Sequence, residues 1–247
     1  GINMIYPDRS EFFWARADGK GLGPTPLAGL QAAKRLTYHD LTMYTEAGTG
    51  KLSVISIQSY RSNFPDGSNG GAGIGDMAFG TKSLLSDSEL FQLSLQFLTY
   101  VPTGNARKGL GTEHVALEPS LLFAVQVSCD TYLQGQVAER IPLGGDPDYS
   151  GGVLRYNLAV NHVLLRPAPQ IQLIGTGELV GYTFHSGSYT DPFAGTRESA
   201  GGTYISLGPG LRLAFCDRLD FGLGTSFAVT DPHFAASLFR TEFRYRY

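Results

Sequence analysis

The sequence lacks any long hydrophobic run. Its longest wholly apolar stretch, residues 121–125, is far shorter than the about 20 residues that a transmembrane helix needs. Charge is also scarce, because charged residues make up 17% of the chain against roughly 25% in typical soluble domains. The net charge is −3, so no basic field suggests nucleic acid as a partner. The missing apolar runs exclude a helical membrane protein.

Cysteine and histidine are also few. Cys129 and Cys216 each precede an aspartate in a predicted tight turn, and the two turns lie four strands apart. Neighbouring strands are about 4.8 Å apart, and a disulfide needs Cα atoms within about 7 Å, so we predict two free or externally paired thiols. No histidine stands at metal-ligand spacing from a cysteine or carboxylate, so no metal or cofactor is expected. The histidines are His39, His114, His162, His185 and His233.

What the sequence does have is alternation of apolar and polar residues with period two, which indicates strands. Phe91, Leu93, Leu95 and Phe97 share one face of a predicted strand, and two glutamines and a serine share the other. Residues 239–247 alternate four aromatics and a threonine with three arginines and a glutamate. Many such segments reach the roughly 9–11 residues that a tilted strand needs to cross a bilayer, whereas soluble strands usually have about 5–6.

Twelve strands are predicted, an even number as in bacterial outer-membrane barrels. The first strand has the least support, since it depends on Phe12, Phe13, Trp14 and this even count. The predicted ranges are 11–17, 40–48, 52–61, 73–84, 89–101, 115–127, 131–141, 152–165, 170–183, 202–215, 218–229 and 234–247.

The connections between these strands alternate in length. Tight turns at 48–51, 85–88, 128–130, 166–169 and 216–217 alternate with longer loops, apart from a short final loop near 230–232. Short turns on the periplasmic side and longer loops outside are typical of outer-membrane barrels. We therefore predict one domain over residues 1–247. It is an all-β, transmembrane, antiparallel up-and-down barrel in the cell outer membrane, with a long loop or plug-like segment at 18–39.

The two ends of the chain fit this interpretation. No charged segment followed by an apolar one opens the chain at Gly1, so we expect a mature chain if the protein is exported. Tyr247 ends an alternating aromatic strand, as in the C-terminal assembly signal of outer-membrane barrels. In a soluble protein, an edge strand exposing Phe239, Phe243 and Tyr245 would invite aggregation.

Several short motifs resemble one protein family. They are Gly75-Asp76-Met77-Ala78-Phe79-Gly80-Thr81-Lys82, Tyr100-Val101-Pro102-Thr103-Gly104-Asn105, Gly109-Leu110-Gly111-Thr112 and Leu117-Glu118-Pro119-Ser120. In this order they resemble the meta-pathway phenol-degradation family of outer-membrane barrels, from about residue 40 to the C-terminus. Residues 141–148 are similar to planctomycete members. The resemblance implies uptake of aromatic compounds, and it supplies no catalytic residues.

Strand parity predicts which charged residues face the barrel interior. A charged residue facing lipid costs about 2–4 kcal/mol at the bilayer midplane, so the polar face should point inward. The predicted inward set holds seven basic and six acidic groups, and this near balance predicts weak ion selectivity. The set is Glu46, Asp76, Lys82, Glu118, Arg140, Arg155, Glu178, Arg212, Asp220, Arg240, Glu242, Arg244 and Arg246.

Two functions remain open at this point. The first is a passive channel for small, including aromatic, solutes, lined by this polar wall. The second is a structural barrel subunit or anchor of a larger envelope assembly, in which inward ion pairs and loops close the lumen. Twelve strands lie between the filled eight-strand and the open 16–18-strand cases. An outer-membrane lipid hydrolase with a Ser/His pair is less favoured, so we expect no enzyme. The expected partners are outer-membrane lipids, small solutes and candidate envelope proteins.

Overall fold

The computed structural model describes residues 36–65, 71–105, 110–111, 114–143, 152–185, 187–191, 195–199, 202–216, 218–230 and 237–246. These residues form fourteen strands. They are β1 (Leu36–Thr49), β2 (Leu52–Pro65), β3 (Gly71–Ile74), β4 (Met77–Asp87), β5 (Phe91–Val101), β6 (Val115–Gln126), β7 (Thr131–Leu143), β8 (Val153–Ala168), β9 (Ile171–Phe184), β10 (Gly187–Asp191), β11 (Gly195–Ser199), β12 (Gly202–Phe215), β13 (Leu219–Ala228) and β14 (Ser237–Tyr245).

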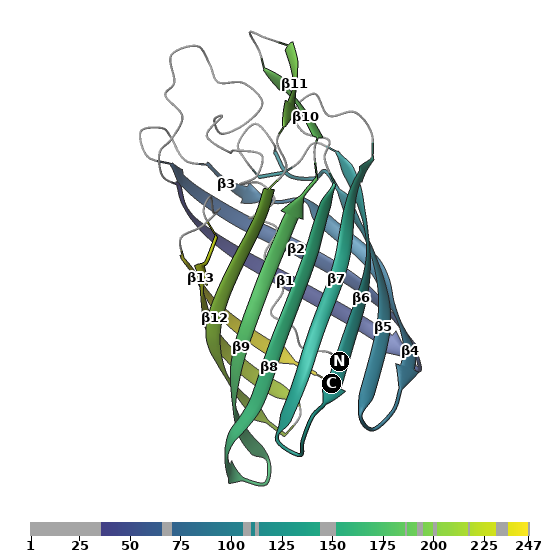
Figure 1. The fold of residues 1–247 in the computed structure, drawn as a ribbon, viewed down its shortest axis with the longest axis vertical. Coiled ribbons are helices and arrows are strands. Elements are labelled where there is room, and N and C mark those ends of the chain that lie inside the picture. Colours follow the sequence, from purple (N-terminus) through teal and green to yellow (C-terminus); the bar gives the residue numbers. More distant parts are fainter. Residues whose placement is uncertain are drawn as a thin grey trace.

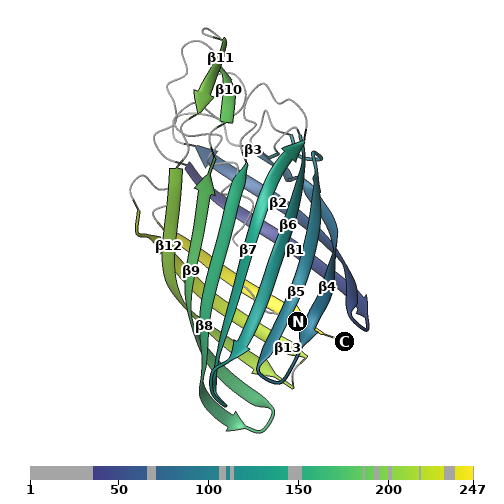
Figure 2. The ribbon, with the colours of Figure 1, turned by 45° about the vertical axis from the view of Figure 1, so that its right-hand side comes forward.

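One twelve-stranded antiparallel sheet contains all of these strands except β10 and β11, which pair only with each other. Its hydrogen-bonded order is β1-β2-β4-β5-β6-β7-β8-β9-β12-β13-β14, and β3 also pairs with β2. Each long strand therefore pairs with the next long strand along the chain, in up-and-down order. Figures 1 and 2 show that the sheet curls round, so that β1 and β2 pass behind β7, β8 and β9.

The structure confirms the predicted all-β class and eleven of the twelve predicted strand positions. The predicted strand at 73–84 is interrupted at residues 75–76, which separate β3 from β4. The first predicted strand, at 11–17, and its pairing with the C-terminal strand lie outside the described residues. So does most of the predicted loop at 18–39, although β1 already begins at Leu36.

The connections sort by length as the sequence predicted. The turn between β1 and β2 has two residues, and its Gly50 adopts a positive φ of 56°, which glycine tolerates in tight hairpin turns. The turns β4–β5, β6–β7, β8–β9 and β12–β13 are also short. The longer connections lie at the other end, where β10 and β11 form a hairpin that the sequence did not predict (Figure 1).

The outer face of the sheet is apolar and the inner face polar, the reverse of a soluble domain. Large exposed apolar side chains occur on ten of the eleven long strands, all but β9, and include Phe97, Leu121 and Phe221. Fully buried side chains include Gln96, Gln136 and others that are polar or charged. Among the described residues, no helix is long and apolar enough to cross a membrane. An apolar exterior around a polar interior is the arrangement of a membrane-spanning barrel.

The outward glycines of β9 are partly covered by neighbouring side chains. The Tyr156 ring lies where a Cβ at Gly181 would stand, and Leu164 lies over Gly175. A Cβ at Gly177 would meet nothing within 4 Å. Of these three glycines, only Gly177 therefore leaves the outer surface open, and the others accommodate a large neighbouring side chain.

Candidate functional site

The predicted interior residues lie on one face of the curled sheet. Register pairs Glu118 with Leu98, Arg155 with Ala138, and Arg212 with Gly222, all at inward positions. The same parity holds for Glu46, Lys82, Arg140, Glu178, Asp220, Arg240, Glu242, Arg244 and Arg246. Asp76 is the exception, because it lies in the break between β3 and β4. Their role in lining a pore stays a prediction.

A buried ion pair joins β6 to β8 in the half of the barrel nearer the long loops. The Arg155 guanidinium donates to both carboxylate oxygens of Glu118, at 2.9 and 2.7 Å. Tyr100 donates to the same carboxylate at 3.2 Å, and the Arg140 guanidinium lies 3.8 Å from the centre of the Tyr100 ring. Glu118 and Arg140 are each 1% exposed. This group therefore fills the interior beside β5–β8.

A second charged network connects β12, β13 and β14 nearer the tight turns. Arg212 binds both Asp220 and Glu242, the latter at 2.7 Å. Arg244 donates to Glu242 at 2.6 Å, and Arg246 donates to Asp220 at 2.8 Å. Sequence parity placed these five residues on one face, and the structure brings them together in one network.

Two further ion pairs occupy the wall formed by β1, β2 and β4. Lys82 binds Glu46 at 2.6 Å. Glu46 also accepts a hydrogen bond from Ser53 at 2.6 Å. Arg61 and Asp40 form a two-bonded pair, with both distances 2.7 Å. The sequence analysis missed this second pair. The two-residue turn at 50–51 could have revealed it, because that turn sets the register in which Asp40 faces Arg61.

Buried amide side chains continue the polar wall along β7, β8 and β9. The Thr176 hydroxyl donates to the Asn161 side-chain oxygen at 2.9 Å, and Asn161 donates to Gln134 at 3.3 Å. Asn157 donates to Gln136 at 3.5 Å. Only the register of these strands shows which of their amide side chains meet.

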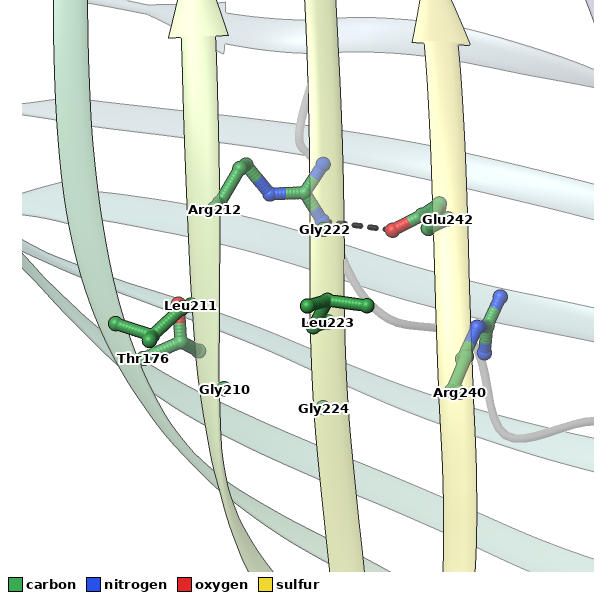
Figure 3. A pocket seen from close by; sticks show the side chains of 9 residues that line it. All are labelled: Thr176, Gly210, Leu211, Arg212, Gly222, Leu223, Gly224, Arg240 and Glu242. Carbon is green, nitrogen blue, oxygen red and sulfur yellow. Dashed lines mark hydrogen bonds and ion pairs between the residues drawn. The ribbon is translucent and has the colours of Figure 1, made fainter.

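A pocket lies on the inner side of β9, β12, β13 and β14 (Figure 3). Arg212, Glu242 and Arg240 line it, with the Arg212–Glu242 ion pair crossing Gly222. Its other lining residues are Thr176, Gly210, Gly222 and Gly224, together with Leu211 and Leu223, whose side chains have outward parity. No group of three His, Cys, Asp or Glu among the described residues could hold a metal ion.

Short motifs noted in the sequence meet at the long-loop end of the barrel. The Thr103 hydroxyl donates to the Gly75 carbonyl at 3.0 Å and accepts from the Met77 amide at 2.9 Å. The Gly104 amide donates to the Asp76 carboxylate at 3.0 Å. These contacts join the break between β3 and β4 to the loop after β5. We call these contacts the loop clasp. Within it, the Asp76 carboxylate orders the loop after β5.

His162 and both cysteines lie at exposed positions. His162 lies exposed on the outer face, where its Nδ1 is 2.8 Å from the Thr131 hydroxyl. Cys129 and Cys216 are both exposed and free, and both lie in turns at the short-turn end.

The sequence matches a family described as "Putative MetA-pathway of phenol degradation" over residues 31–241. The chain belongs to this family. The match covers all four motif segments noted above, including those that form the loop clasp. No curated protein matches the sequence. A solved structure titled "NanC porin structure in rhombohedral crystal form" is similar at a TM-score of 0.47 and 9% identity, covering 84% of this chain and 99% of that one.

Proposed function

We propose that this protein is a passive channel for small solutes in the cell outer membrane. The proposal rests on the contrast between the apolar outer face and the polar inner face of the sheet. The outer face exposes large apolar side chains on ten of the eleven long strands, while the inner face holds ion pairs and amides from β1 to β14. Lipids of the outer membrane would cover the outer face, and the inner face would let polar solutes pass.

The solutes that we propose are small and include aromatic compounds. The family description concerns phenol degradation, which supports this solute class. The proposal assigns no catalytic residue; most of the predicted inward charges are held in ion pairs, and two of these pairs cross an intervening strand.

Conductance in planar lipid bilayers tests the channel. We expect discrete steps with weak ion preference, because inward charges of the two signs nearly cancel. The pair Asp40–Arg61 adds one charge of each sign and leaves this balance unchanged. Protein that is correctly folded in the bilayer but silent at all voltages would overturn the proposal.

A structural barrel with a closed lumen is the second candidate, and one observation favours it. Inward side chains on β5–β7 are almost fully buried, including Gln96, Gln136, Glu118 and Arg140 at 1% each. An inner wall facing open water would be more exposed, so this part of the interior is packed. Uptake of small sugars into vesicles containing the protein distinguishes the candidates, because a closed barrel admits none.

A further inference from the structure

Beyond Arg212 and Asp220, part of the inner wall of β12 and β13 carries no side chains. Consecutive inward positions are glycine on both strands: Gly208 and Gly210 on β12, and Gly222 and Gly224 on β13. Gly210 and Gly224 face each other in register, and Thr176 and Arg240 flank them on the adjoining strands. The backbone itself therefore forms the floor of the pocket in Figure 3, and the surrounding side chains form its rim.

Arg240 differs from the other basic residues of this wall. Arg212, Arg244 and Arg246 are each bound to Asp220 or Glu242. Among the residues that the structure describes, Arg240 makes no ion pair or hydrogen bond, although its charge acts electrostatically on Glu242. The wall thus carries four arginines against two carboxylates, and the uncommitted guanidinium stands at the edge of the pocket (Figure 3).

We propose that Arg240, at the edge of this pocket, binds the carboxylate group of a small organic anion. A guanidinium presents a planar fork of donors that matches a carboxylate and binds it through two parallel hydrogen bonds. Gly210, Gly222 and Gly224, which lie beside Arg240 in register, carry no side chain that would compete for its donors. If the protein is the proposed channel, the pocket is one binding position for such anions as they pass along β12, β13 and β14.

Charges around the pocket favour a monocarboxylate over a more highly charged anion. Glu242 stands on one side, already neutralised by Arg212 and Arg244. Glu178 is the next inward residue after Thr176 on β9, and it faces Gly208 in register. Like charges repel at close range, so a second negative charge on the ligand would meet these carboxylates without a free cation to balance it.

Calorimetric titration of the refolded, full-length protein with sodium benzoate tests the proposal, because binding does not require an open channel. Arg240→Gln should weaken benzoate binding roughly tenfold or more, since hydrogen bonds to charged groups are worth more than neutral ones. Arg240→Lys should weaken it less, because the charge remains and the fork is lost. Sodium sulfate should bind more weakly than benzoate to the wild-type protein.

Arg246→Gln is the matched control. It removes the same charge from the same face of the same terminal segment, but Arg246 binds Asp220 and does not line the pocket. We expect its benzoate affinity to stay within about twofold of the wild type, since the site itself is intact. Equal weakening by both variants would show a general charge effect and overturn the site, as would absence of benzoate binding to the wild-type protein.

Conductance measured on the same variants separates this proposal from the channel itself. Benzoate binding by a protein that conducts no ions would support the pocket and refute the channel. Conductance without benzoate binding would support the channel and refute the pocket. Circular dichroism should show equal strand content in every variant, so that a lost affinity reports on the site and not on folding.

Discussion

The ion pairs of this protein differ in how strongly water screens a charge that has lost its partner. The Glu118 side chain is buried and accepts hydrogen bonds from both Arg155 and Tyr100. The Arg166–Asp130 pair, in contrast, has more than two fifths of each side chain exposed. Removing one partner of a buried pair leaves an uncompensated charge, whereas water screens an exposed one. Burial therefore decides which ion pairs of this protein matter for stability.

Glu118→Gln should lower the free energy of unfolding by about 3–5 kcal/mol, because Arg155 would stay buried without a carboxylate partner. Arg166→Gln should change it by at most about 1 kcal/mol, as for exposed pairs. Urea titration of the protein in lipid vesicles, followed by tryptophan fluorescence, measures both. Similar losses in the two variants would contradict the buried role of the Glu118–Arg155 pair.

At the scale of elements, β14 shows how one strand separates two environments. Phe239, Phe243 and Tyr245 point outward, and Phe243 is 68% exposed. Arg240, Glu242, Arg244 and Arg246 point inward, as their register with β13 shows. The predicted faces of this strand are confirmed for the described residues, while Tyr247 lies outside them. A one-residue slip would exchange the two faces.

Phe243→Arg should prevent folding into membranes, because an arginine facing lipid near the midplane costs about 2–4 kcal/mol and the lipid-facing aromatic side chain is lost as well. Arg244→Gln should be tolerated, since Glu242 keeps its bond to Arg212. The fraction folded into vesicles, measured by protease resistance, compares the two variants. Equal loss of assembly would show that the face assignment of β14 is wrong.

At the scale of the whole molecule, the lengths of the connections define a direction. All five tight turns lie at one end of the barrel and the longer connections at the other. In outer-membrane barrels the short turns are periplasmic. Cys129 and Cys216 both lie in tight turns and are exposed, so both thiols should be reachable from the periplasm.

A membrane-impermeant maleimide should therefore label neither cysteine in intact cells that express the protein. Both should react once the outer membrane is permeabilised. Cys129→Ser and Cys216→Ser, made singly, assign the label to each turn, and the double variant gives the background. Labelling in intact cells would show that the barrel has the opposite orientation.

Much of this architecture follows from local patterns in the sequence. Period two in strands such as β5 and β14 determines both their length and their two faces, because successive side chains alternate across a strand. The order of tight turns and long connections determines the up-and-down topology, since short turns can only join neighbouring antiparallel strands. The break at residues 75–76 and the β10–β11 hairpin could not be predicted from the sequence. Neither changes the alternation of apolar and polar residues from which the strands were predicted.

The candidate site depended more on tertiary structure. The sequence determined by itself which charged residues share the inward face, since a charge facing lipid is costly. Only the register decided that Arg155 meets Glu118 while Arg240 stands beside Gly224 without an ion pair among the described residues. Parity is a property of one strand, whereas a contact needs the relative shift of two strands and the curvature that brings distant strands together. For that reason the sequence determined the polar wall, and only the tertiary structure decided where that wall leaves a pocket.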